Sequence, residues 1–466
     1  MMSLMEAALA TGGMAVGGNP RIEGVSTDSR TLASGELFIA LRGERFDGHA
    51  FVEAAAERGA AAVMVDAAWA EGRVPHMPML VVADTRLALG YLGAWWRAHF
   101  ELPLVGITGS NGKTTVKEMT AAILRAQALL DGYDPDLAVL ATVGNLNNDI
   151  GLPQMLLRLH GTHRAAVIEM GMNHPGEIAY LTRLAQPTVA LVNNAQRAHL
   201  AGLGGVAEVA RAKGEIFDGL CSGGTAVINA DDPFSALWRE MNAGRRTLSF
   251  GLEQPADVHG RAEQQVLGSL LAIETPQGAL EVALAVPGLH NARNALAATA
   301  AALATGATLD AVARGLTSFA GVKGRLQVRP VAGGALLIDD SYNANPDSVR
   351  AAIDVLATTP GKKILVLGDM GEIGGQAGQF HDEIGGYAKS QGVDVLFALG
   401  EHSELAARNF GAGGRHFGGV DALLSALQPE LGADTVVLVK GSRFMRMERV
   451  ANAVAADGMA AQEKVH

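Results

Sequence analysis

The chain has 466 residues, a length that suggests about three domains. With 48% hydrophobic and 18% charged residues, it is not predominantly disordered. Its 48 acidic and 37 basic residues give a net charge of −11, which argues against nucleic acid or an anionic membrane as the main partner. The single cysteine, Cys221, excludes an intramolecular disulfide and fits a reducing compartment. We therefore expect a cytoplasmic protein without a membrane span. The sequence leaves the oligomeric state open, and a monomer is the default expectation.

The first hundred residues alternate short apolar runs with helical ones. Strands are predicted at Glu36–Leu41, Ala61–Val65 and Met79–Val82, and a helix from about His49 to Arg58. This alternation is typical of the α/β class with mostly parallel sheets, and we expect a small α/β domain over residues 1–100.

A second unit is expected over residues 101–321. Its predicted strands are Leu104–Thr108, Ala165–Glu169, Thr188–Asn193 and Thr225–Asn229. The alternating stretch from Val266 to Val286 predicts antiparallel strands, and a buried, alanine-rich helix is predicted at Asn291–Thr305.

A third α/β unit is expected over residues 322–466. Its predicted strands are Ala335–Asp339, Lys363–Leu367, Val393–Ala398 and Thr435–Val439. A helix should follow Asn345, because this residue is a good N-cap, Pro346 suits the first helical position and Asp347 suits the first turn. Each strand ends in polar or glycine-rich residues, where ligands bind in open α/β sheets.

The most specific local pattern is the segment Thr108-Gly-Ser-Asn-Gly-Lys-Thr-Thr115, which follows a predicted strand and precedes a predicted helix. Glycines let backbone N–H groups turn toward phosphate oxygens, the lysine reaches the β/γ-phosphates, and a hydroxyl can bind Mg²⁺. A strict phosphate-loop pattern has glycine where this chain has Ile107. We predict a triphosphate site made by Gly109, Ser110, Asn111, Gly112, Lys113, Thr114 and Thr115.

This shifted loop resembles that of the ATP-dependent Mur ligases and their folylpolyglutamate synthetase relatives. Further similar segments follow in the order that this family uses, at 167–178, 198–200, 212–217, 288–298, 324–327 and 339–346. The resemblance implies three α/β domains: one that binds a UDP-sugar, a central mononucleotide-binding one and a Rossmann-like one.

The resemblance also implies the cofactors. Thr114 and Glu169 would bind a first Mg²⁺ ion, and His199 a second, together with Lys213 after its carbamylation by CO₂. Asn291 and Asn294, three residues apart on one helix face, would hydrogen-bond the adenine of ATP. Catalytic roles are implied for Lys113, Glu169, His199, Lys213 and Arg325, and ATP contacts for Arg325 and Asp340 on domain closure.

Several segments (144–153, 169–178, 342–346, 367–372 and 439–443) match family members that join D-alanyl-D-alanine to UDP-N-acetylmuramoyl-tripeptide through an acyl phosphate. These two small molecules are the expected partners. The UDP-sugar is expected at Thr27, Asp28, Ser29 and Arg30, and its muramoyl or peptide part at Asn147 and Asn148. The dipeptide is expected at Tyr342, Asn343, Asn345, Lys440 and Arg443. Asp369 and Glu372 could serve as a base or could simply cap turns.

Three alternatives remain open at this stage. The chain could be another ligase of the same family, adding the third amino acid or extending a folate. It could instead be a phosphate-loop switch or motor whose output is hydrolysis, or a non-catalytic UDP-sugar-binding module. The residue at the third position of the tripeptide, diaminopimelate or lysine, is not determined by these patterns.

Overall fold

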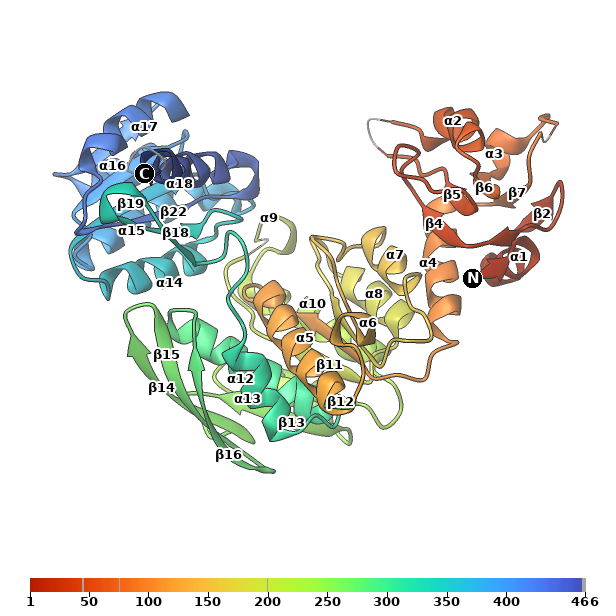
Figure 1. Ribbon diagram of the computed structural model, residues 1–466, viewed down its shortest axis with the longest axis horizontal. Helices are drawn as coiled ribbons and strands as arrows, with labels where there is room; N and C mark the ends of the chain where they lie inside the picture. The colour runs from red at the N-terminus through yellow and green to blue at the C-terminus, as the bar shows by residue number, and fades with distance from the viewer. Residues whose placement is uncertain (44–45, 75, 199, 463–466) are drawn as a thin grey trace.

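A computed structural model describes residues 1–43, 46–74, 76–198 and 200–462. It contains three large sheets that follow one another along the chain, and Figure 1 shows the first and third on opposite sides of the central one. Both faces of each sheet are covered by apolar clusters. The α/β class with three layered units, predicted from the alternation, is confirmed.

The first sheet has five strands in the order β2-β7-β6-β5-β4, all parallel except β2. Its strands are Met14–Val16 (β2), Gly24–Ser26 (β4), Glu36–Ile39 (β5), Ala62–Asp66 (β6) and Met79–Val82 (β7). A small ribbon pairs Met2–Ser3 (β1) with Arg21–Ile22 (β3). Its helices are Leu4–Thr11 (α1), Val52–Glu57 (α2, after the 3₁₀ turn Gly48–Phe51), Ala67–Ala70 (α3) and Thr85–Arg97 (α4).

The central sheet has nine strands in the order β16-β15-β14-β13-β12-β11-β8-β10-β9. From β9 to β14 neighbouring strands are parallel. The strands β15 and β16 pair antiparallel as predicted, and β14, which precedes the predicted stretch, pairs antiparallel with β15. The strands are Leu104–Thr108 (β8), Val139–Ala141 (β9), Ala165–Glu169 (β10), Val189–Val192 (β11), Thr225–Asn229 (β12), Arg246–Gly251 (β13), Val258–Gln265 (β14), Gly268–Thr275 (β15) and Gly278–Leu284 (β16).

Helices cover both faces of the central sheet. They are Lys113–Leu130 (α5), Pro135–Ala138 (α6), Gly151–Leu156 (α7), Glu177–Ala185 (α8), Leu200–Leu203 (α9), Val206–Gly214 (α10, continued by the 3₁₀ turn Glu215–Gly219), Ser235–Met241 (α11), Leu289–Ala304 (α12) and Leu309–Thr317 (α13). The alanine-rich α12 is buried between the sheet and α5, as predicted, because small side chains let helices pack closely.

The third sheet has the order β17-β18-β22-β19-β20-β21, parallel except for β17. Its strands are Gln327–Pro330 (β17), Leu336–Asp340 (β18), Lys362–Gly368 (β19), Val395–Leu399 (β20), Gly414–Phe417 (β21) and Thr435–Lys440 (β22). Its helices are Pro346–Ala357 (α14), Ala377–Ser390 (α15), Ser403–Phe410 (α16), Val420–Leu427 (α17) and Glu448–Gln462 (α18). Asn345 is the N-cap of α14, as predicted.

The predicted strands recur within a few residues, but the strands β1 to β4, together with β9, β13, β14, β17 and β21, were not predicted. Most of these contain only two to four residues, too few to show a clear period. Within the described residues, no helix is both long and apolar enough to cross a bilayer.

Candidate functional site

The phosphate loop lies between β8 and α5 and is shaped by two glycines. Gly112 has φ +79°, and a Cβ atom there would lie 2.4 Å from Asn294 Oδ1 and 2.6 Å from Asn193 Nδ2. Gly109 also has a positive φ, +156°. Only glycine fits at position 112, so the loop wraps closely around the N-terminus of α5, where backbone N–H groups favour an anion.

Lys113 is the first residue of α5, and its side chain folds back over the loop. Its Nζ donates to the carbonyls of Gly109 at 2.7 Å and Ser110 at 3.3 Å. Burial lowers the pKa of this ammonium, and the Glu169 carboxylate partly opposes that shift. The lysine is therefore held where a phosphate group on the loop would meet it.

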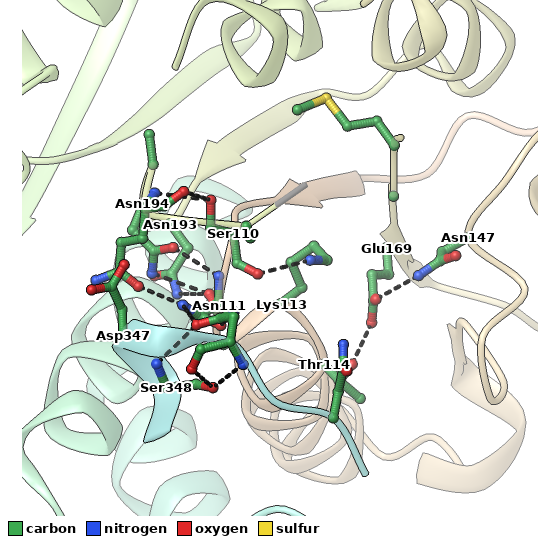
Figure 2. A pocket seen from close by; sticks show the side chains of 18 of the residues that line it. Ser110, Asn111, Lys113, Thr114, Asn147, Glu169, Asn193, Asn194, Asp347 and Ser348 are labelled. Atoms are coloured by element: carbon green, nitrogen blue, oxygen red, sulfur yellow. Dashed lines mark hydrogen bonds between the residues drawn. The ribbon is translucent and has the colours of Figure 1, made fainter. Parts of the chain in front are cut away.

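Thr114 and Glu169 lie side by side, as the metal-site prediction requires. Glu169 ends β10, and the adjacent β8 leads into the loop that precedes Thr114. Thr114 Oγ1 donates to Glu169 Oε2 at 2.8 Å, and Asn147 Nδ2 donates to Glu169 Oε1 at 2.8 Å. Figure 2 shows this row of three side chains. Asn147, predicted to contact substrate, also positions the carboxylate.

Lys213 lies in the last turn of α10 and is fully buried, at 1% exposure. Within the part of the chain that the structure describes, its ammonium has no hydrogen bond or ion pair. Burial, and to a lesser degree the charge of Lys113, holds its pKa well below the usual range. This amine therefore gives up its proton more readily than an exposed lysine does. His199, predicted to bind the second metal ion, lies outside the described residues.

Asn291 and Asn294 lie on the first turns of α12, both buried. Asn294 donates to Asn291 Oδ1 at 3.1 Å and accepts from Asn193 at 3.0 Å, and Asn291 donates to the Pro287 carbonyl. They join a polar network beside the phosphate loop, which suits the predicted adenine contact.

Arg325 joins the third unit to the phosphate loop. Its guanidinium donates to Thr114 Oγ1 at 3.0 Å and lies over the Tyr342 ring, 4.5 Å from the centroid. Arg443 lies over the same ring at 5.5 Å. Tyr342 thus contacts two cations, both of which were predicted at the site.

Asp340 and Lys440 end the adjacent strands β18 and β22 and form an ion pair. Lys440 Nζ donates to Asp340 Oδ2 at 2.5 Å and to the Asn343 carbonyl at 2.9 Å. Asp340 was predicted for ATP and Lys440 for the dipeptide, but in the structure the two bind each other. Burial raises the pKa of Asp340 although Lys440 opposes the shift.

A second set of contacts between the central and third units was not predicted. Arg197 binds the Asp347 carboxylate through its Nη2 at 2.6 Å, its Nε at 3.0 Å and its backbone N–H at 2.9 Å. Asn345 Nδ2 donates to Asn111 Oδ1 of the phosphate loop at 2.7 Å. Asn345, predicted for the dipeptide, therefore caps α14 and touches the nucleotide loop. Arg197 could be found only by knowing that β11 ends beside β8.

One cavity of about 1360 Å³ connects these groups. Most of the predicted site residues line it: Ser110, Asn111, Gly112, Lys113, Thr114, Thr115, Asn147, Asn148, Glu169, Asn291, Asn294, Arg325, Asp340, Tyr342, Asn343, Asn345, Lys440 and Arg443. Lys213 and Gly109 are not among the lining residues. Glu372, with φ +61°, also lines it, whereas Asp369 accepts the backbone N–H of Ser403 at 2.8 Å and so caps α16.

The segment Thr27–Arg30 is not part of this cavity wall. It follows β4 in the first unit, where Arg30 binds Asp28 at 2.7 and 2.9 Å. That contact lowers the pKa of Asp28 to about 2. From the first unit, Asp84, Arg86 and Leu87 reach the cavity instead.

Comparisons with known proteins agree with this geometry. Three family models match in chain order: "Mur ligase family, catalytic domain" over 21–94, "Mur ligase middle domain" over 107–302 and "Mur ligase, glutamate ligase domain" over 324–443. A UDP-N-acetylmuramoyl-tripeptide–D-alanyl-D-alanine ligase of Escherichia coli strain K12 is 43% identical over 95% of this chain and 96% of its own.

Two solved structures are also similar. One is the UDP-N-acetylmuramoylalanyl-D-glutamyl-2,6-diaminopimelate–D-alanyl-D-alanyl ligase of Acinetobacter baumannii, with TM-score 0.85, 37% identity and coverage of 97% of this chain and 98% of that one. The other is a MurF ligase of Thermotoga maritima in complex with ADP, with TM-score 0.81, 28% identity and coverage of 94% and 98%.

Proposed function

The chain belongs to the Mur ligase family, and we propose that it joins D-alanyl-D-alanine to UDP-N-acetylmuramoyl-tripeptide with hydrolysis of ATP to ADP and phosphate. The observation that carries this proposal is the single cavity in which the phosphate loop, the Thr114–Glu169 pair and the cations Arg325 and Arg443 face one another. A switch or motor has no need of the substrate walls that the first and third units add.

The chemistry begins with charge repulsion. The terminal carboxylate of the tripeptide must attack the γ-phosphate of ATP, so two anions approach, and cations must stabilise the charge that develops between them. Lys113 lies at the phosphate loop, and Arg325 reaches the same loop from the third unit. The attack by the carboxylate forms an acyl phosphate and breaks the bond between the γ-phosphorus and the bridging oxygen, so that ADP leaves. The dipeptide amine then attacks the carbonyl carbon of the acyl phosphate, phosphate leaves, and the amine proton is released.

Thr114 and Glu169 fit a magnesium ion because their oxygens are adjacent, 2.8 Å apart, and Mg²⁺ prefers oxygen ligands. When bound, the ion would neutralise phosphate charge. His199 and Lys213 are our proposed ligands for a second ion.

Lys213 suits carbamylation because CO₂ reacts with a neutral amine, and burial lowers the pKa of this amine and so favours its neutral form. The resulting anion would supply the oxygen donors that an ammonium lacks. A carbamate signal in ¹³C NMR of protein prepared with labelled bicarbonate, absent in Lys213→Ala, would test this proposal.

The three units divide the substrates among them in this proposal, with boundaries near residues 100 and 322. The UDP-sugar binds to the first unit at Thr27–Arg30, ATP to the central one with adenine at Asn291 and Asn294, and the dipeptide to the third. We also propose a monomer. The location that we propose is the cytoplasm, where ATP is available.

Phosphate release tests the function. With ATP and Mg²⁺ present, we expect release only when both UDP-N-acetylmuramoyl-tripeptide and D-alanyl-D-alanine are added, together with a pentapeptide product detected by mass spectrometry. Release without either substrate would contradict the proposal in favour of a switch or motor. If a different amine is consumed, the proposed ligase chemistry stands and the proposed amine substrate is wrong.

A further inference from the structure

A salt bridge between Arg86 and Asp149 crosses the junction of the first and central units. Arg86 Nη2 donates to Asp149 Oδ1 at 2.8 Å, and Arg86 Nε donates to Asp149 Oδ2. Both residues line the same cavity as the phosphate loop. Their side chains are 53% and 31% exposed, so the pair is reachable from the cavity and costs little to open.

Both partners are held in place by rigid neighbours. Asp84 caps α4 and accepts the backbone N–H groups of Arg86 and Leu87 at 2.8 and 3.0 Å. On the other side, Asn148 Oδ1 accepts the Gly151 N–H at 2.8 Å at the start of α7. Since α4 packs against α7, the cation and the anion keep a fixed relation to each other.

A short stretch of chain connects this pair to Glu169, beside which we propose that the tripeptide carboxylate reacts. Asn147 binds Glu169 directly, and Asp149 follows only two residues later, so the Cα atoms of Asn147 and Asp149 are at most about 7 Å apart. The third residue of the tripeptide carries the carboxylate that reacts near Glu169. Its extended side chain spans roughly 6 Å to the terminal carbon, a matching reach.

Diaminopimelate and lysine differ only at that terminal carbon. Both carry an ammonium group there, but diaminopimelate also carries a carboxylate. Resting on the proposed function, we propose that Arg86 and Asp149 bind the distal ammonium and carboxylate of diaminopimelate, and so select it over lysine as the third residue. The distal carboxylate pairs with the Arg86 guanidinium and the distal ammonium with Asp149, so both side chains exchange one partner for another and neither is left unpaired.

The test is the ratio of kcat/KM values for the diaminopimelate and lysine tripeptides. We expect the unmodified protein to prefer the diaminopimelate substrate by about tenfold or more, since it gains a charge-assisted contact at a half-exposed site. Arg86→Gln should bring this ratio to within about threefold of one, and Arg86→Lys should leave it in between. Asp149→Asn should lower kcat/KM for both substrates, because both carry the ammonium.

A matched control is Arg314→Gln, which removes a similarly exposed ion pair with Asp310 on α13, and which should leave the ratio unchanged. If the salt bridge serves only to tie the two units together, Arg86→Gln will lower both values equally and the ratio will stay constant; that result overturns the inference. An unmodified protein without preference also overturns it. If neither tripeptide is consumed, the proposed function itself fails.

Discussion

The cavity edge of the central sheet and that of the third sheet use charged side chains differently. At the central edge, Glu169 accepts hydrogen bonds from the neutral groups of Thr114 and Asn147, so its negative charge faces the cavity without a bound cation among the described residues. At the third edge, Asp340 and Lys440 neutralise each other.

This difference distinguishes side chains that are available to bind a ligand from side chains that stabilise the structure of the cavity wall. A carboxylate satisfied by neutral donors retains its charge and can attract a cation. In a buried ion pair the two charges neutralise each other. Removing one partner leaves the other charge buried without compensation, which destabilises the fold. Substitution should therefore cost activity at the central edge and stability at the third.

The largest effect is expected at Glu169 and Lys113. Glu169→Gln keeps the shape but removes the charge, and Lys113→Ala removes the cation beside the phosphates, so each should lower kcat by about 10³-fold. Phosphate release with both substrates measures this, and chemical denaturation should show a change of no more than about 1 kcal/mol for Glu169→Gln.

Glu263→Gln on the exposed part of β14 is the matched control, because it removes a carboxylate from the same sheet without touching the cavity. A Glu169→Gln protein with more than a tenth of the original kcat would contradict the role assigned to this residue.

A stability effect is expected at the third edge. Asp340→Asn leaves the Lys440 ammonium buried without its anion, so the free energy of unfolding should fall by about 3 kcal/mol. Urea denaturation monitored by far-ultraviolet circular dichroism would measure this fall in the free energy of unfolding. Asp340→Asn combined with Lys440→Met should recover part of it, because no buried charge then remains. An unchanged midpoint in Asp340→Asn would remove the distinction between the two edges.

Arg197 and Asp347 connect the central and third edges. Their loss should affect the closure of the third unit onto the phosphate loop, and should have a smaller effect than the substitutions above. Asp347→Ala should lower kcat/KM for ATP about tenfold, since the third unit would spend less time against the phosphate loop. Arg197→Ala should give the same loss, and the double variant no further loss, because the two groups act as one pair. Additive losses would contradict that coupling.

The sequence was sufficient for the parts of the fold and site that depend on local pattern. The strand ends at Thr108 and Glu169, the glycines of the phosphate loop and the cap at Asn345 each follow from a few neighbouring residues. These features were predicted at the correct residues because the local sequence determines where a strand ends or a helix is capped.

Features that depend on pairing between distant segments were not predictable. The Arg197–Asp347 and Arg86–Asp149 contacts join residues 150 and 63 positions apart, and no local pattern marks them. For the same reason the ion pair between Asp340 and Lys440 was not predicted: it follows from the pairing of β18 with β22, which is visible only in the folded sheet.

The smallest effect concerns His290, at the start of α12 where the two edges meet. Burial, with the nearby charges of Lys440 and Arg293, lowers the pKa of His290 to about 4 in the folded protein. Between pH 6.5 and 4 the unfolded chain therefore binds a proton that the folded chain does not, and stability falls as the pH falls. Replacing His290 by glutamine removes this linkage. We expect the free energy of unfolding of the unmodified protein to decrease by about 2 kcal/mol more than that of His290→Gln between pH 7 and 4.5. Equal decreases in the free energy of unfolding would show that the imidazole is protonated in the folded protein. The surroundings of His290 would then tolerate a charge, as the central edge does.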